Sequence, residues 1–168
     1  MVGLPREPSR PVLERLLALH IALYRPEIPP NTGNVGRLCV GVGAVLHVIH
    51  PIGFSMSAKA VRRAGLDYWK HVEVHEHADG EAFWAWAGER KVHLFSSHGA
   101  EPHTACPAAD GDVLLFGPES VGLPTEWVER RGAYRIPLWG PVRSLNLSNA
   151  VAVATYAALQ RIEPERFA

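Results

Sequence analysis

The chain has 168 residues and a mass of 18.4 kDa, which is the size of one ordinary domain. Hydrophobic residues make up 47% of it and 17 basic side chains balance 17 acidic ones, which excludes the composition of a disordered chain. No apolar stretch reaches the roughly 18 residues of a membrane-spanning helix, and we expect neither a membrane segment nor a secretory signal. Two cysteines, Cys39 and Cys106, are too few for a disulfide framework, which favours a cytoplasmic protein.

Residues 1–17 are rich in proline and arginine, and we expect them to form an extension to a single domain over residues 18–168. In chain order, apolar runs and turn residues predict strand Ala18–Tyr24, helix Val35–Val42, strand Val45–Ile49, helix Ser57–Ala64, strand Val72–Val74, helix Gly80–Ala87, strands Val92–Ser96 and Asp112–Phe116, helix Thr125–Arg131, strand Tyr134–Pro137 and helix Leu147–Ile162. Asn31 or Thr32 is expected to cap the first helix, and Thr125 the fourth. Apolar strands that alternate with helices are typical of an α/β domain with a mainly parallel sheet flanked by helices.

Three polar, glycine-containing loops follow predicted strands. They are RPEIPPNTGN (25–34), FGPESVGLP (116–124) and WGPVRSLNLSN (139–149). The carboxyl ends of parallel strands meet at one edge of a sheet, where α/β proteins bind their ligands, so the loops are expected to build one site together. None of them matches a named phosphate-binding motif, and each taken singly is also explained by an ordinary turn.

The stretch HVEVHEH places His71, Glu73, His75 and His77 at every second position. On a strand these side chains would share one face. Such a row could chelate zinc, and it is equally the pattern of a solvated strand face. We expect the solvated face and no bound metal.

The charge pattern leaves nucleic-acid binding open. Neutral net charge is unusual for a strongly electrostatic nucleic-acid binder, but 14 of the 17 cations are arginine, which binds phosphate with a bidentate fork. Coding bias explains the same arginine excess. Trp84 and Trp86 are expected in the core or at an interface rather than as platforms for stacked bases.

In order along the chain, NTGNVGRLC (31–39), FGPESVGLP (116–124) and RSLNLSNAVAVATY (143–156) resemble the three motifs of SPOUT-superfamily RNA 2′-O-ribose methyltransferases. Together with LYRPEIPPNTGNVGRLC, HPIGF, VRRAGLDYW and DGDVLLFGPE, they resemble the small YibK-like, TrmL-type group, which methylates the wobble ribose of tRNA. The likeness covers about residues 18–160 without large gaps.

This resemblance implies a deep trefoil knot in the C-terminal part of the α/β fold, the SPOUT α/β knot. It also implies that the knot loops bind S-adenosylmethionine and that a homodimer completes the site. By position in the motifs, the methyl donor is expected among Phe95, Gly117, Ile136, Ser144, Leu145 and Leu147. The residues expected to hold the loops in place are Glu119, Gly122, Asn146, Ser148 and Asn149.

The resemblance further implies that Arg37 is the key side chain of the reaction. Because a guanidinium is effectively always protonated, we expect Arg37 to orient the ribose and bind its phosphate rather than act as a base. Asn31 is expected to shape the catalytic loop, and Tyr156 to reach the site across the dimer. Contacts to the anticodon stem-loop of tRNA are expected from Arg62, Arg63 and Arg143.

Four functions are compatible with these observations. The first is S-adenosylmethionine-dependent 2′-O-methylation of nucleotide 34, a cytidine or uridine, in tRNA. The second is the same reaction at another RNA site, such as one in rRNA. The third is a knotted RNA-binding module without catalysis, and the fourth is a generic nucleotide-binding α/β protein. The complete motifs, with Arg37 present, favour the first.

Overall fold

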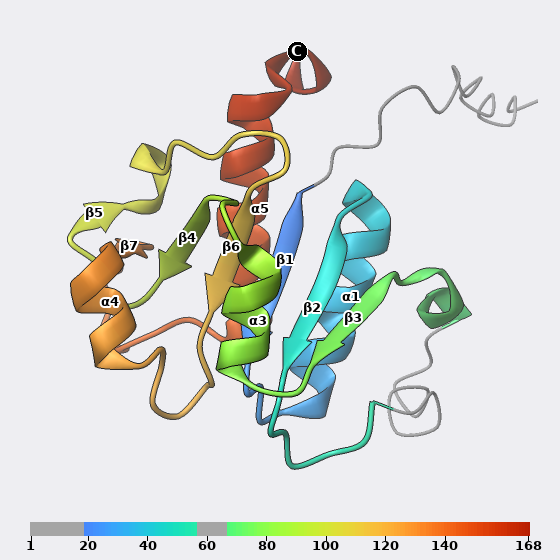
Figure 1. The fold of residues 1–168 in the computed structure, drawn as a ribbon. Helices are drawn as coiled ribbons and strands as arrows, with labels where there is room; N and C mark the ends of the chain where they lie inside the picture. The colour runs from blue at the N-terminus through green and yellow to red at the C-terminus, as the bar shows by residue number, and fades with distance from the viewer. Residues whose placement is uncertain (1–18, 57–66) are drawn as a thin grey trace, which may run out of the picture.

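The computed structural model describes residues 19–56 and 67–168. Within these residues seven strands form one sheet in the order β3-β2-β1-β6-β4-β7-β5, and neighbouring strands are parallel (Figure 1). The strands are β1 (His20–Tyr24), β2 (Val45–Ile49), β3 (Val74–His77), β4 (Val92–Phe95), β5 (Glu101–Pro102), β6 (Val113–Phe116) and β7 (Tyr134–Arg135). The predicted α/β class with a mainly parallel sheet is confirmed.

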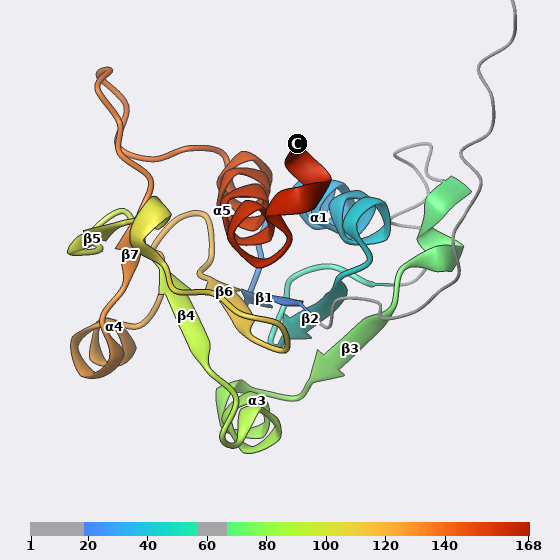
Figure 2. The ribbon, with the colours of Figure 1, turned by 90° about the horizontal axis from the view of Figure 1, so that it is seen from above.

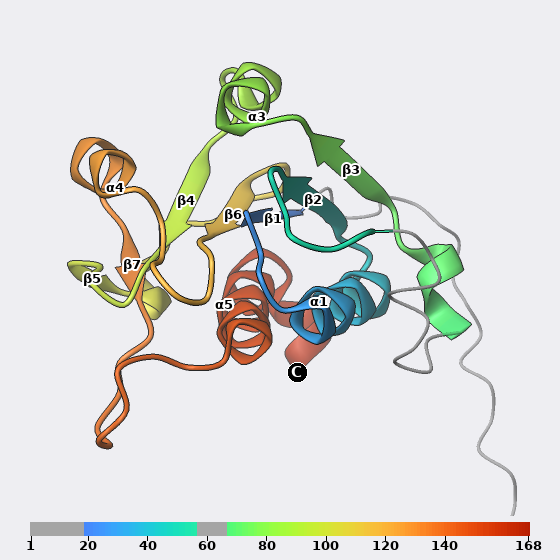
Figure 3. The same cartoon turned by 90° about the horizontal axis from the view of Figure 1, so that it is seen from below.

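Helices cover both faces of this sheet. They are α1 (Pro29–Val42), α3 (Gly80–Ala87), α4 (Thr125–Arg131) and α5 (Leu147–Ile162), with short 3-10 turns η1 (Asp67–His71), η2 (His103–Ala105) and η3 (Pro164–Phe167). Helices α1 and α5 lie side by side on one face, while α3 and α4 lie on the other (Figures 2 and 3). None of the helices in the described parts of the chain is long and apolar enough to span a membrane.

The central strand β1 shows why the inner strands of the sheet are mainly apolar. Ile21 and Leu23 belong to the apolar cluster under α1 and α5, whereas Ala22 and Tyr24 belong to the cluster that contains Phe83 of α3. Successive side chains point to opposite faces of a strand, so a sheet that is covered on both faces needs apolar residues at every position.

Helix α1 begins six residues earlier than predicted, at Pro29 instead of Val35, and the expected caps Asn31 and Thr32 are wrong. Ile28 is the N-cap residue, and Pro29 and Pro30 occupy the first positions of the helix. Proline suits the first helical turn because its missing N–H has no intrahelical partner there. The fourth predicted helix starts at Thr125 as expected, but its N-cap is Pro124 rather than Thr125.

The other differences lie in the short polar elements. Strand β3 covers Val74–His77 instead of Val72–Val74, because the histidine-rich stretch itself pairs with β2. The two-residue strand β5 and the turn η2 have no apolar run that would predict them. The predicted extension 1–17 and the predicted helix Ser57–Ala64 lie outside the described residues.

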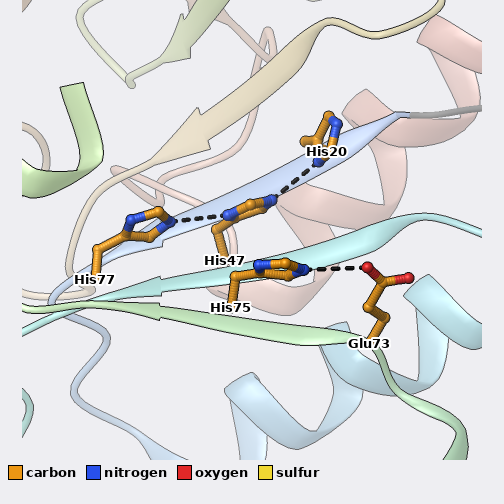
Figure 4. A network of polar contacts seen from close by, with 5 residues as sticks. All are labelled: His20, His47, Glu73, His75 and His77. Atoms are coloured by element: carbon orange, nitrogen blue, oxygen red, sulfur yellow. Dashed lines mark hydrogen bonds and ion pairs between the residues drawn. The ribbon is translucent and has the colours of Figure 1, made fainter. Parts of the chain in front are cut away.

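Three histidines from neighbouring strands form a continuous buried chain on the α3 side of the sheet (Figure 4). Nδ1 of His20 in β1 and Nε2 of His47 in β2 are joined by a hydrogen bond of 2.9 Å. A second hydrogen bond of 2.9 Å joins Nδ1 of His47 to Nε2 of His77 in β3. The ring of Trp86 from α3 lies against His47, with 4.1 Å between the ring centroids. The chain thus links three strands beneath one indole.

The histidine row predicted from the sequence is only partly one surface. His75 is exposed, stacks on His47 and donates a hydrogen bond from Nε2 to Oε1 of Glu73 at 3.0 Å, whereas His77 on the same strand is buried. Among residues 19–56 and 67–168, no group of three or more His, Cys, Asp or Glu side chains is arranged to hold a metal ion.

Burial keeps this chain of histidines neutral. His47 is fully buried, and desolvation, followed by the charges that His20 and His77 would carry, lowers its pKa to about 2. Desolvation is also the main reason that the pKa values of His20 and His77 lie below their ordinary value. A neutral imidazole donates with one nitrogen and accepts with the other, so a row of neutral rings satisfies both inner contacts.

The buried histidines predict that the free energy of unfolding falls as the pH drops below about 6.5, the ordinary histidine pKa. In the unfolded chain these rings take up protons there, whereas in the folded protein their lowered pKa values prevent it. Their contribution is therefore fully present above that pH and is lost on acidification. Replacing His47 with Asn should reduce the loss between about pH 7.5 and about pH 5 by about 2 kcal/mol, measured by urea unfolding.

The exposed His71 supplies the control, because solvent surrounds this side chain in both states. His71→Asn should therefore keep the pH dependence of the wild-type protein. An equal loss of stability on acidification in His47→Asn and in the wild type would show that the buried chain is not its source.

Candidate functional site

An open cleft of about 1240 Å³ lies at the carboxyl ends of β4, β6 and β7. Its walls come from the segments that follow these strands, from the segment that precedes α5, and from the start of α1. The three polar loops that the sequence singled out all reach it, because a parallel sheet brings the ends of its strands to one edge. The residues that line the cleft include Asn31, Phe95, Gly117, Glu119, Gly122, Ile136, Arg143, Ser144, Leu145, Asn146 and Leu147.

The loop after β6 folds back on itself, and glycine makes this possible. A Cβ atom on Gly117 would lie 2.3 Å from the backbone nitrogen of Leu123, so no other residue fits without moving the backbone. Gly122 has a φ of +72°, in the left-handed region that favours glycine. The tight return leaves the backbone of residues 117–122 open to a ligand in the cleft.

The Glu119 carboxylate joins this loop to the start of α1. Oε2 accepts the backbone N–H of Glu27 at 2.8 Å, while Oε1 accepts the backbone N–H of Ile28 at 3.1 Å and Nδ2 of Asn31 at 3.0 Å. Two of these donors stand just ahead of the helix, where N–H groups lack intrahelical partners and the helix dipole favours negative charge. Glu119 therefore supplies the acidic cap that no residue within α1 provides.

The Glu27 carboxylate, in turn, binds the loop after β6. Its carboxylate accepts the backbone N–H of Ser120 at 2.8 Å and the Ser120 hydroxyl at 2.6 Å. The two neighbouring loops thus exchange carboxylates, each binding the backbone of the other. Sequence reasoning missed Glu27, because no local spacing connects it to a loop more than ninety residues further along the chain.

Asn146 connects the third loop to the same network. Its Nδ2 donates to Oδ1 of Asn31 at 2.9 Å, and its Oδ1 accepts the backbone N–H and the hydroxyl of Ser148. Asn146 is also the N-cap of α5. One continuous chain of hydrogen bonds therefore runs from Ser148 through Asn146 and Asn31 to Glu119, across all three loops.

All six residues expected around the methyl donor line the cleft: Phe95, Gly117, Ile136, Ser144, Leu145 and Leu147. The Phe95 ring is 7% exposed and stacks on Phe116, with 4.9 Å between the centroids and 14° between the planes. Phe95 therefore forms part of the floor of the cleft rather than a free wall.

The remaining expected site residues lie elsewhere. Among the described residues that line the cleft, Arg37, Tyr156, Ser148 and Asn149 do not occur. Arg37 is exposed on α1, with its guanidinium carbon 5.7 Å from the centre of the Tyr68 ring. Tyr156 is 51% exposed on α5. Asn149 is exposed in the first turn of the same helix.

The structure describes one of the three expected RNA-binding arginines. Arg143 is exposed at the cleft. Arg62 and Arg63 lie outside the described residues, so their expected role stays a prediction.

The described residues form a seven-stranded parallel sheet with a cleft that the three motif loops build at its carboxyl edge, and known families share this architecture. The model of the SpoU rRNA Methylase family matches residues 18–156, and the chain belongs to this family. The resemblance to RNA 2′-O-ribose methyltransferases is confirmed.

Individual proteins within this family show which members the chain is similar to. The chain is 44% identical over 147 residues to the tRNA (cytidine(34)-2'-O)-methyltransferase of Escherichia coli K12, covering 86% of this chain and 94% of the relative. A solved structure described as giving structural insights into the 2-OH methylation of C/U34 on tRNA superposes with a TM-score of 0.83 and 45% identity, covering 88% of this chain and 97% of that one. An AdoMet-bound rRNA methyltransferase from Sinorhizobium meliloti superposes with a TM-score of 0.76 and 26% identity, covering 87% of this chain and 57% of that one.

Removing the Glu119 carboxylate should loosen the start of α1. In Glu119→Ala, the amide hydrogens of Glu27 and Ile28 lose their acceptor, and we expect them to exchange with solvent at least about tenfold faster, as hydrogen bonds to a charged group contribute about 1.5–3 kcal/mol. Glu119→Gln keeps one acceptor oxygen and should give an intermediate rate. Amide hydrogen exchange followed by NMR measures both.

Glu126→Ala is the matched control, because Glu126 is exposed on α4 and makes an ion pair only with Arg130, at 3.5 Å, among the described residues. It should leave the exchange of the Glu27 and Ile28 amides unchanged. Wild-type exchange rates in Glu119→Ala would contradict the capping role of Glu119.

Proposed function

We propose that this protein transfers a methyl group from S-adenosylmethionine to the 2′-hydroxyl of the wobble ribose of tRNA, where nucleotide 34 is a cytidine or a uridine. The observation that carries this proposal is the cleft in which the three family motifs are tied together by Glu119, Asn31 and Asn146. The tRNA methyltransferase from Escherichia coli is matched over 94% of its length, whereas the rRNA methyltransferase structure is matched over 57%, which favours tRNA over rRNA as the substrate.

The cleft fits a sulfonium nucleoside as the methyl donor. Phe95 and Leu147 give it an apolar floor for an adenine ring, and Gly117 lets backbone groups approach the ligand closely. Ile136, Ser144 and Leu145 form further parts of the lining. When bound, S-adenosylmethionine supplies a methyl group that is already activated by the positive sulfur, so the protein needs to position the acceptor and exclude water.

Arg37 positions that acceptor. Aligned reacting groups held about 3–3.5 Å apart gain most of the rate that orientation can supply. The guanidinium stays protonated, and its fork of N–H donors suits a ribose hydroxyl together with the neighbouring phosphate. Arg37 has no ion-pair partner among residues 19–56 and 67–168, so its donors are available to RNA.

A symmetric homodimer completes the site in this proposal. Arg37 on α1 and Tyr156 on α5 both lie outside the cleft of their own chain, and the two helices pack against each other on one face of the sheet. That face exposes Val153 and Tyr156. In this proposal a second copy docks on that face by two-fold symmetry, so the same patch of both chains forms the interface. Arg37 of the partner subunit then reaches each cleft.

The RNA contacts follow from the same geometry. Arg143 at the cleft is available to bind phosphates of the anticodon stem-loop, and Arg62 and Arg63 are proposed to do the same. Sequence-specific RNA recognition usually targets unstacked loop bases, which suits nucleotide 34 in the anticodon loop. We also propose that the protein acts in the cytoplasm, where tRNA is modified, and the free, buried Cys39 and Cys106 support this.

We also infer that the C-terminal part of the chain forms the trefoil knot of the SPOUT fold. Strand β6 inserts between β1 and β4, β7 then pairs on the far side of β4, and α5 returns to pack on α1 and β6. The segment that joins β7 to α5 lines the cleft together with the folded loop after β6, and the closeness of these two segments supports a threaded chain.

The position of the methyl mark tests the proposed function. The purified protein, incubated with S-adenosylmethionine and unmethylated tRNA, should add a single 2′-O-methyl group at nucleotide 34, which mass spectrometry of nuclease digests locates. The same tRNA with a 2′-deoxyribose at nucleotide 34 should remain unmethylated. A mark at another nucleotide, or methylation of an rRNA fragment in preference to tRNA, would contradict the proposal.

A mixing experiment tests whether Arg37 acts on the cleft of the other chain. Arg37→Ala should lower the rate of methyl transfer at least about 100-fold, because misplacing the reacting groups can cost that much. Calorimetry should show unchanged S-adenosylmethionine binding. Gly117→Ala should abolish methyl-donor binding, because its Cβ meets the backbone of Leu123. Unfolding the two inactive variants together and refolding them should return about one quarter of the wild-type activity, since random pairing makes half of the dimers mixed and each has one intact site.

Each inactive variant refolded alone is the control and should stay inactive. If the mixture also stays inactive although mixed dimers are detected by native mass spectrometry, Arg37 serves the cleft of its own chain, and the proposal that the partner subunit completes the site is wrong.

A further inference from the structure

The turn η1 is fastened to the helix that carries Arg37. The Tyr68 hydroxyl donates a hydrogen bond to the carbonyl oxygen of Gly33 at 2.8 Å. In an α-helix the carbonyl of residue 33 is also the acceptor for the backbone N–H of residue 37. The Tyr68 hydroxyl therefore reaches the carbonyl that pairs with the backbone of Arg37.

A second contact fixes the same turn one helical step further along. The Trp69 ring fills the notch left by Gly36, where a Cβ atom would lie 2.4 Å from Cζ3 of Trp69. Tyr68 and Trp69 thus engage Gly33 and Gly36, which lie on one face of α1 because helical residues three apart are neighbours. Any larger residue at position 36 would push the turn away from the helix.

This arrangement brings the Tyr68 ring to the guanidinium of Arg37. The guanidinium carbon lies 5.7 Å from the ring centroid, within the range of a cation–π contact. Tyr68 is half-buried, and burial raises its pKa, so its hydroxyl keeps the proton that it donates to Gly33. Arginine has many rotamers, and a fixed aromatic surface restricts those that this exposed side chain visits.

We propose that Tyr68 is the positioning residue for Arg37: its hydroxyl anchors the ring on Gly33, and the ring holds the guanidinium in the orientation in which it receives the RNA ribose. This inference rests on the proposed function, in which Arg37 orients the acceptor. Tyr68 itself does not touch the reacting atoms. Its effect runs through Arg37 alone, which separates it from a residue that only stabilises the fold.

The first test measures methyl transfer to tRNA in single-turnover reactions. Tyr68→Leu should lower the rate about fivefold, the effect expected from losing one exposed cation–π contact, with unchanged affinity for S-adenosylmethionine. Tyr68→Phe keeps the ring and should restore most of the rate. In the Arg37→Ala background, Tyr68→Leu should cause no further loss. An equal loss with and without Arg37 would overturn the proposal, as would a wild-type rate in Tyr68→Leu.

His71→Asn on the same turn is the control variant, and it should match the wild-type rate. Thermal unfolding of every variant confirms that it is folded at the assay temperature. A wild-type protein that methylates no tRNA would refute the proposed function and leave the following measurement to decide the role of Tyr68.

The second test needs no activity. In NMR spectra of the wild-type protein, the Nε–H group of Arg37 should show an upfield ring-current shift and restricted motion. Both should be kept in Tyr68→Phe and lost in Tyr68→Leu. An Arg37 side chain that is equally free in wild type and in Tyr68→Leu would overturn the proposal, and an unshifted wild-type resonance would do so even if Tyr68→Leu failed to fold.

Discussion

The candidate site depends on one interaction, the acceptance of three N–H groups by the Glu119 carboxylate. Two of its donors belong to the segment ahead of α1 and the third, Asn31, to the first turn of the helix, while Glu119 itself belongs to the loop after β6. A carboxylate that accepts several N–H groups makes hydrogen bonds about twice as strong as neutral ones. The helix that carries Arg37 is therefore fixed at its first turn by the same loop that forms the wall of the cleft. This contact sets the position of α1 relative to the cleft.

The parallel sheet brings the segment before α1 and the loop after β6 close enough for this contact. Strands β1 and β6 are neighbours in register, with Leu23 opposite Phe116, so the loops that follow them start side by side. Because both faces of the sheet are covered, all ligand contacts have to come from its edge. Short polar side chains then connect the loops: Asn31 has an amide nitrogen that donates to Glu119 and an oxygen that accepts from Asn146. An ionised Asp, which has no donor, could not make both contacts.

Local patterns in the sequence predict β2, α3, α4 and α5 with their observed bounds. Apolar runs indicate β2, α3 and α5, whereas Thr125 and the acidic Glu126 mark the start of α4. The sequence predicts too late a start for α1, because the first turn of this helix is stabilised by Glu119, which lies far away along the chain. The predicted bounds of β3 are wrong because its polar residues pair at an edge of the sheet. There, His47 of β2 gives His77 a buried hydrogen-bond partner. The motifs identified the lining of the cleft, but the partnership of Glu27 with Ser120 depends on long-range contacts that no local pattern encodes.

Glycine in α1 connects the packing of the fold to the proposed chemistry. Glycine in a helix interior costs about 0.5–1 kcal/mol relative to alanine, so Gly33 and Gly36 are unfavourable for the helix taken alone. At position 36 the cost is offset by the Trp69 ring, which occupies the space that a side chain would fill. The close approach also lets the Tyr68 hydroxyl reach the helix backbone at Gly33. A helix made more stable by alanine at position 36 would lose this turn, and the aromatic surface beneath Arg37 with it.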